Sequence, residues 1–242
     1  MPATDKSAVN QRVASLTRTY GHLDGAALLR VMIEREFPGR IAVVSSFGSE
    51  SAVILNLVAE IDPTTPVLFL DTRMHFAETL AYRDALIERL DLAEVRVIGP
   101  DPVAVDAQDP AGRLWQSNAE RCCYLRKVLP LRRALQGFDA WTTGRKRYQG
   151  GTRAALEPIE ADGGRIKINP LATWSPQDIE AAFEFAELPR HPLAGKGYTS
   201  IGCAPCTRPV LSPVLEPAAR AGRWAETQKT ECGIHWPEDA RP

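Results

Sequence analysis

Five cysteines are the residues of this chain best suited to chemistry, and four of them form two close pairs. Cys122 and Cys123 are adjacent, whereas Ala-Pro separates Cys203 from Cys206. Four thiolates can complete a tetrahedral zinc site or hold an iron–sulfur cluster. Adjacent cysteines on a helix project about 100° apart, which a cluster with several iron corners accommodates better than one zinc ion. The spacing therefore favours an iron–sulfur cluster over zinc.

The fifth cysteine, Cys232, stands alone in the segment TECGIH, between Lys229 and His235. Two pairs and a single residue suit metal ligation or thiol chemistry in a reducing compartment better than a disulfide framework. The first residues are polar, unlike the apolar core of a secretory signal, and no segment reaches the ~18 apolar residues of a membrane span. We therefore expect a cytoplasmic protein with no membrane partner.

A candidate anion-binding loop, SSFGSES, lies between a β-branched run and an apolar helical pattern. Backbone N–H groups and the helix dipole at such a turn favour phosphate or sulfate, and Gly48 lets the backbone approach closely. The alternative is an ordinary turn in which a serine caps the helix. The stretch resembles the S-G-G-x-D-S loop of ATP pyrophosphatases, with Phe47 and Glu50 in place of a glycine and the aspartate. These replacements favour binding an adenylyl anhydride without releasing pyrophosphate.

Positive charge gathers in the segment TGRKRYQGGTR, residues 143–153, directly after a predicted strand. Guanidinium groups pair well with sulfate and phosphate oxygens. A solvated charge run or an RNA contact would use the same residues. The formal net charge is −1 and few aromatic residues accompany the cluster, so we favour a small dianion over nucleic acid. Lys127, one helical turn beyond Cys123, would add a cation beside the cysteines.

Short apolar runs alternate with helical patterns along most of the chain, which predicts an α/β fold with a mostly parallel sheet flanked by helices. The predicted strands are 41–47, 66–71, 95–100, 138–144 and 165–171, and the predicted helices lie within 8–36 and at 52–61, 76–90, 121–135 and 175–187. Pro130 is expected to kink or end its helix. Asp71 ends a predicted strand, where open α/β sheets bind ligands. We expect a single domain over residues 1–242, in which residues 190–242 form a mobile lid and tail.

Together these motifs resemble the assimilatory adenylyl-sulfate and phosphoadenylyl-sulfate reductases, from about residue 40 to residue 236. The combination of IGCAPCT with an upstream CC and a downstream ECG-x-H is highly specific to that family. Further matches are LDTRMHFAETLAYRD, RCCYLRKVLPL, WTTGRKRYQGGTRAAL and AGRW. The resemblance implies an adenine nucleotide alpha hydrolase-like (PP-loop) fold and an enzyme of sulfate assimilation and cysteine biosynthesis.

By this resemblance, the paired cysteines Cys122, Cys123, Cys203 and Cys206 would ligate a [4Fe–4S] cluster. Cys232 would be the nucleophile that attacks the sulfur of bound adenylyl sulfate, so that AMP leaves and an S-sulfocysteine remains. Thioredoxin or a glutaredoxin would then release sulfite. Nearby cations, among them Lys229, His235 and the substrate-binding arginines, would lower the pKa of the thiol.

The resemblance adds Arg220, Arg223, Lys127 and His235 to the site residues that the loops above already suggest. The expected catalytic residues are Cys232, His235 and Lys127. The expected substrate-binding residues are Ser45, Ser46, Phe47, Gly48, Ser49, Glu50, Ser51, Asp71, Arg145, Arg147, Gln149, Arg153, Arg220 and Arg223. Family members with the cluster cysteines generally use adenylyl sulfate, which is the substrate we expect. The loops around Arg73 and Arg145 depart from the family pattern, so 3′-phosphoadenylyl sulfate stays open as the alternative.

Two more distant functions also fit parts of the sequence. A tRNA-thiolating ATP pyrophosphatase can combine a similar loop with an iron–sulfur centre, although Phe47 and Glu50 disfavour it. A non-catalytic module in which four cysteines bind zinc and the basic loop touches RNA is the second. Metal content separates these functions, because iron with acid-labile sulfide excludes the zinc module.

Overall fold

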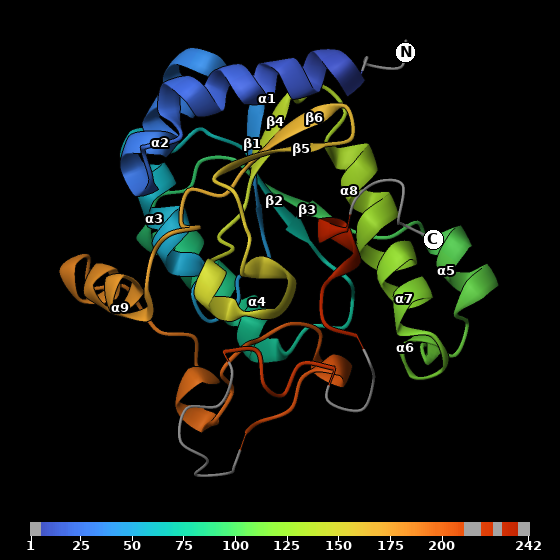
Figure 1. Cartoon of the computed structure of the whole chain (residues 1–242). Helices are drawn as coiled ribbons and strands as arrows, with labels where there is room; N and C mark the ends of the chain where they lie inside the picture. The colour runs from blue at the N-terminus through green and yellow to red at the C-terminus, as the bar shows by residue number, and fades with distance from the viewer. Residues whose placement is uncertain (1–5, 211–218, 225–228, 237–242) are drawn as a thin grey trace.

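A six-stranded sheet forms the centre of the computed structural model, which describes residues 6–210, 219–224 and 229–236 (Figure 1). Among these residues the strand order is β3-β2-β1-β4-β6-β5. The strands are β1 (Ile41–Ser45), β2 (Val67–Leu70), β3 (Val95–Ile98), β4 (Ala140–Thr142), β5 (Ile159–Asp162) and β6 (Arg165–Ile168). All neighbours pair in parallel except β5 and β6, which form an antiparallel hairpin. The predicted mostly parallel α/β fold is therefore confirmed.

Both faces of the central strands are buried, because helices cover the sheet on each side. Along β1, Ile41 and Val43 belong to one apolar cluster and Ala42 and Val44 to another, as expected from the alternation of side chains along a strand. The first cluster includes residues of α1 (Lys6–Tyr20), α2 (Gly25–Val31), α3 (Ser51–Ile61), α4 (Ala77–Arg89) and α9 (Pro176–Phe185). The second includes residues of α8 (Leu129–Ala134) and the segment around Cys232. The C-terminal segment is thus part of the second layer.

Each predicted strand and helix exists, with ends that differ by a few residues. The sequence analysis missed β5, whose polar segment IEAD offers no apolar alternation, and α5 (Pro102–Gln108). That helix begins where Asp101 caps it with a side-chain oxygen 2.9 Å from the Val103 nitrogen. Short helices α6 (Leu114–Ser117) and α7 (Ala119–Cys123) follow. No described helix has the length and apolar character needed to cross a bilayer.

Pro130 neither ends nor interrupts the helix that carries Cys122 and Cys123. The helix runs from α7 through the π-helical turn η2 (Tyr124–Val128) into α8, where Pro130 lies in the first turn. The Leu129 N–H donates to the Tyr124 carbonyl, the wider spacing of a π-helix. Since proline lacks an N–H, this widened turn removes the need for one hydrogen bond and lets the chain continue as helix.

Candidate active site

A pocket of about 180 Å³ lies beyond the carboxyl ends of β1 and β4, where the chain order of the sheet reverses. Open α/β sheets bind ligands at this switch point. Most of the residues expected from the sequence to bind substrate or catalyse line it. They are Ser45, Ser46, Gly48, Ser49, Glu50, Ser51, Lys127, Arg145, Gln149, Arg153, Arg220, Arg223, Cys232 and His235. Five separate stretches of the chain therefore meet in one cavity.

Phe47, Asp71 and Arg147 lie outside the lining of this pocket. Phe47 has a φ of 48° and is fully buried, and its ring packs edge-on against Phe69 in the core. The carboxylate of Asp71 accepts a hydrogen bond from the backbone N–H of Arg73. Arg147 donates from Nε to the Leu156 carbonyl at 2.7 Å, away from the pocket. These contacts direct the three side chains away from the pocket, although their positions in the sequence predicted that they bind substrate.

The loop from Ser45 to Ser51 forms what we call the neutral wall of the pocket, because the charge of Glu50 is paired with that of Lys146. The Gly48 N–H donates to Ser51 Oγ at 2.8 Å, and α3 begins at Ser51. A Cβ on Gly48 would lie 3.1 Å from the Ile201 carbonyl oxygen, so the neighbouring backbone approaches closely here. The N-terminal end of an eleven-residue helix therefore faces the cavity, as an anion site requires.

Glu50 links this neutral wall to the next loop. Its carboxylate accepts hydrogen bonds from Lys146 Nζ at 2.6 Å, Tyr148 Oη at 2.5 Å and Gln149 Nε2 at 3.0 Å. Burial would raise the pKa of Glu50, but the charge of Lys146 and these hydrogen bonds outweigh burial and lower it. Lys146 was not among the expected site residues, although it lies in the basic segment, and its side chain is almost fully buried.

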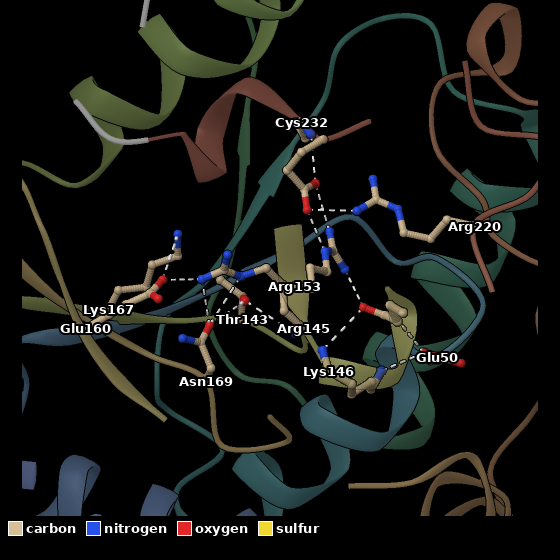
Figure 2. Close-up of polar contacts among 12 residues, drawn as sticks. Glu50, Thr143, Arg145, Lys146, Arg153, Glu160, Lys167, Asn169, Arg220 and Cys232 are labelled. Carbon is tan, nitrogen blue, oxygen red and sulfur yellow. Dashed lines mark hydrogen bonds and ion pairs between the residues drawn. The ribbon is translucent and has the colours of Figure 1, made fainter. Parts of the chain in front are cut away.

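Arg145, Lys146, Arg153 and Arg220 form the cationic wall of the pocket (Figure 2). Arg145 pairs with Glu160 and donates to the Asn169 side chain at 3.0 Å. Arg153 and Arg220 both donate to Glu231, the residue before Cys232. These largely buried cations are thus held by carboxylates from other segments of the chain.

Cys232 lies inside the pocket, and the described part of the tail around it is packed rather than exposed. The Cys232 side chain is buried, and its thiol contacts that of Cys123. A hydrogen bond from Cys123 and the positive charge of Lys127 hold the pKa of Cys232 well below its usual range, although burial acts in the opposite direction. Lys229 pairs with Glu120 on α7. The expected mobility of this tail stays a prediction, and its residues 211–218, 225–228 and 237–242 lie outside the described residues.

His235 is a neutral side chain stacked on the sheet. Its ring is parallel to that of Trp141 within 5°, with centroids 6.2 Å apart. Burial, reinforced by the charges of Arg145 and Lys167, holds the pKa of His235 well below its usual range. His235 therefore contributes no positive charge to lower the pKa of Cys232, a role that Lys127 fills instead.

The four paired cysteines lie beside the pocket, behind Lys127. All are free thiols, and the pKa of Cys122 is raised to about 12 by burial and by its neighbours Cys203 and Cys206. Cys203 Sγ lies 3.3 Å from the Thr72 hydroxyl. Within the described residues, no three His, Cys, Asp or Glu side chains surround a single ion position. The two pairs thus approach each other without converging on one point.

A family model and curated relatives match this chain over most of its length. The model for the phosphoadenosine phosphosulfate reductase domain matches residues 40–209. The adenosine 5′-phosphosulfate reductase of Mesorhizobium japonicum is 50% identical over 94% of this chain and 88% of its own. The phosphoadenosine 5′-phosphosulfate reductase of Gloeobacter violaceus is 38% identical, over 91% of this chain and 92% of its own.

Solved structures with a similar fold include a reductase of the same kind. The phosphoadenylyl-sulfate reductase of Candida auris, crystallised with phosphate, superposes with a TM-score of 0.70 at 28% identity, over 82% of this chain and 97% of that one. Yeast FAD synthetase, at 20% identity and a TM-score of 0.52, covers 84% of this chain and 76% of its own and shares the fold alone. The chain belongs to the phosphoadenosine phosphosulfate reductase domain family.

Proposed function

We propose that this protein reduces adenylyl sulfate to sulfite and AMP, with Cys232 as the nucleophile. The observation that carries the proposal is the position of the Cys232 thiol within a pocket whose wall is built of arginines. The relative from Mesorhizobium japonicum, an adenosine 5′-phosphosulfate reductase, supports this substrate. Sulfate assimilation and cysteine biosynthesis are the processes that use this reaction.

The substrate carries a nucleotide end and a sulfuryl end, which the two walls can hold separately. The loop from Ser45 to Ser51 offers backbone N–H groups and a helix N-terminus to the nucleotide. Arg153, Arg220 and Arg223 offer guanidinium groups to the phosphate and sulfate oxygens. Positioning by fixed charges accelerates a reaction because the reacting atoms are already aligned.

In the first step, the Cys232 thiolate attacks the sulfur of the sulfuryl group. A sulfur–sulfur bond forms, the bond between sulfur and the bridging oxygen breaks, and AMP leaves with that electron pair. Lys127 stabilises the thiolate, because its charge is one cause of the low Cys232 pKa. Since Lys127 also lines the pocket, the same charge can stabilise the sulfuryl oxygens. An S-sulfocysteine remains on Cys232.

In the second step, a protein dithiol of the thioredoxin or glutaredoxin class supplies two electrons. Its first thiolate attacks Sγ of Cys232 and expels sulfite, which leaves a mixed disulfide. Its second thiol then attacks that disulfide, restores Cys232 and leaves the partner oxidised. Because Cys232 must meet this partner, the tail has to leave the pocket once per turnover.

We further propose that Cys122, Cys123, Cys203 and Cys206 hold a [4Fe–4S] cluster. The donor set suits such a group, because four cysteine thiols can ligate it, all four are free, and Cys122 lies near Cys203 and Cys206. When bound, it would act on Lys127 through its charge rather than by supplying electrons. Iron and acid-labile sulfide in brown protein support this assignment, and colourless protein with one zinc ion would exclude it.

The choice of substrate has a direct test. Sulfite release is measured with thioredoxin present and either adenylyl sulfate or 3′-phosphoadenylyl sulfate supplied. We expect faster turnover with adenylyl sulfate. Faster turnover with the 3′-phosphate form would correct the substrate and leave the nucleophile unchanged, whereas no sulfite from either would reject the proposed function.

A further inference from the structure

Glu231, the residue before the nucleophile, binds the arginines of the cationic wall. Its carboxylate accepts from Arg153 Nε at 2.5 Å, Arg153 Nη2 at 2.9 Å and Arg220 Nη1 at 2.8 Å. The backbone N–H of Cys232 also donates to it, at 2.7 Å. Figure 2 shows Arg153 and Arg220 both directed toward the part of the chain that carries Cys232. One carboxylate therefore joins the nucleophile to two cations.

This arrangement is buried, which makes the pairing specific. The Glu231 side chain is 3% exposed, against 11% for Arg153 and 13% for Arg220. Burial would raise the pKa of Glu231, but the hydrogen bonds and charges of the two arginines lower it to about 2. A buried arginine pair without an anion would be costly, because neither guanidinium could recover its lost hydration.

The docked tail also limits the space available to a ligand. The pocket measures about 180 Å³, and Cys232, Ile234 and His235 form part of its lining. Pockets for ligands of drug size usually measure about 300–1,000 Å³. The docked tail therefore leaves little spare room beside a substrate, and both offer anionic groups to the same arginine donors.

We infer that Glu231 is a positioning residue that docks Cys232 into the pocket by acting as the tail's own anion on Arg153 and Arg220. The inference rests on the proposed function, because the substrate's anionic groups would need the same guanidinium groups. A sulfate or phosphate that takes those donors displaces Glu231 and weakens the hold on the tail. The content of the pocket thus controls how firmly the nucleophile is docked.

The test uses the purified protein, with its metal content checked, and Glu231→Gln, which keeps the shape of the side chain and removes its charge. The first readout is alkylation of Cys232 by iodoacetamide without ligand, followed by mass spectrometry of the tail peptide. We expect alkylation about tenfold faster in Glu231→Gln, because the tail loses its charged hydrogen-bond anchor; tenfold corresponds to ~1.4 kcal/mol.

The second readout is affinity for adenylyl sulfate, measured by calorimetry in the Cys232→Ser background so that no turnover occurs. Removing the internal competitor should tighten the binding of adenylyl sulfate by threefold to tenfold. A tenfold change corresponds to ~1.4 kcal/mol. A merely structural glutamate would leave affinity unchanged or weaken it. Glu180→Gln is the matched control, because Glu180 pairs with Arg190 on the exposed surface, and both readouts should stay at wild-type values.

Two results would overturn the inference: Cys232 alkylation as slow in Glu231→Gln as in the wild type, or unchanged or weaker substrate binding. Glu231→Asp, which keeps the charge, guards against a folding defect and should alkylate more slowly than Glu231→Gln. Faster alkylation of the aspartate variant would also count against docking. Failure of the proposed function looks different, because wild-type protein would then form no sulfite while the alkylation comparison stayed readable.

Discussion

The two walls of the pocket bind anions by different means, although they follow neighbouring strands. The neutral wall, Ser45–Ser51 after β1, relies on backbone N–H groups and the start of α3. The cationic wall, formed by Arg145, Lys146 and Arg153 after β4 together with Arg220, relies on largely buried side chains. In the cationic wall, Arg145, Arg153 and Arg220 each pair with a carboxylate from another segment.

This difference explains what each wall contributes. Backbone donors are fixed by the fold and need no partner to stay in place. Buried guanidinium groups need an anion, so the protein supplies Glu160 and Glu231 in the absence of substrate. The neutral wall is therefore preformed, whereas the cationic wall exchanges one anion for another.

The largest loss of activity should come from replacing Cys232, the nucleophile that lies against the cationic wall. Cys232→Ser replaces the thiolate by a far weaker nucleophile, and we expect sulfite release to fall by at least about 10³-fold. Iron content and adenylyl-sulfate affinity should stay near wild-type values, which steady-state kinetics, metal analysis and calorimetry would check. Persistent sulfite release would remove Cys232 from the mechanism.

Two arginines that the sequence analysis expected to bind substrate should behave differently. Arg220→Ala removes a guanidinium that lines the pocket, and we expect substrate affinity to fall by roughly 10- to 100-fold, or about 1.4–3 kcal/mol. Arg147→Ala, the control, removes a side chain that bonds the Leu156 carbonyl outside the pocket, and affinity should change less than about twofold. Equal losses in both variants would contradict the division between the walls.

The neutral wall should respond to a single methyl group. Gly48→Ala places a Cβ 3.1 Å from the Ile201 carbonyl, so the loop must shift by a few tenths of an ångström. We expect KM to rise by roughly three- to tenfold, because the backbone donors move away from the nucleotide. Gly195→Ala has open space around its Cβ and should leave KM unchanged. An unaltered KM in Gly48→Ala would show that the loop makes no close contact.

A separate prediction concerns the pH dependence of stability. The folded-state pKa of Glu231 is about 2, below its ordinary value of 4.5, so its stabilisation is complete above pH 4.5. It is lost as the pH falls from about 4.5 to about 2, by at most ~3 kcal/mol. Urea unfolding of wild type and Glu231→Gln should therefore converge as the pH falls through this range. A constant difference between the two would contradict the ionised pairing with the arginines.

Much of the fold was predictable because local sequence patterns mark most of its strands and helices. The apolar runs of β1 and β2 predict buried parallel strands, and Ser175 with Pro176 predicts the start of α9, where Ser175 Oγ lies 3.2 Å from the Asp178 nitrogen. The polar β5 carries no such signal, because it lies at the edge of the sheet and pairs through its backbone.

The site was predictable as a set of loops but not as a set of contacts. Gly48 and the basic segment mark the two walls through their composition. The pairing of Glu231 with Arg153, 78 positions apart, and the inward turn of Phe47 depend on how distant segments meet. No local pattern encodes such a meeting, so the partners of the cations emerge only from the structure.

The most direct test of the account is mass spectrometry of the tail after the protein is mixed with adenylyl sulfate in the absence of any thiol reductant. We predict a peptide in which Cys232 carries one added SO₃ group, lost again when thioredoxin is supplied. An unmodified Cys232 peptide, in protein that contains iron and demonstrably binds the nucleotide, would contradict the account.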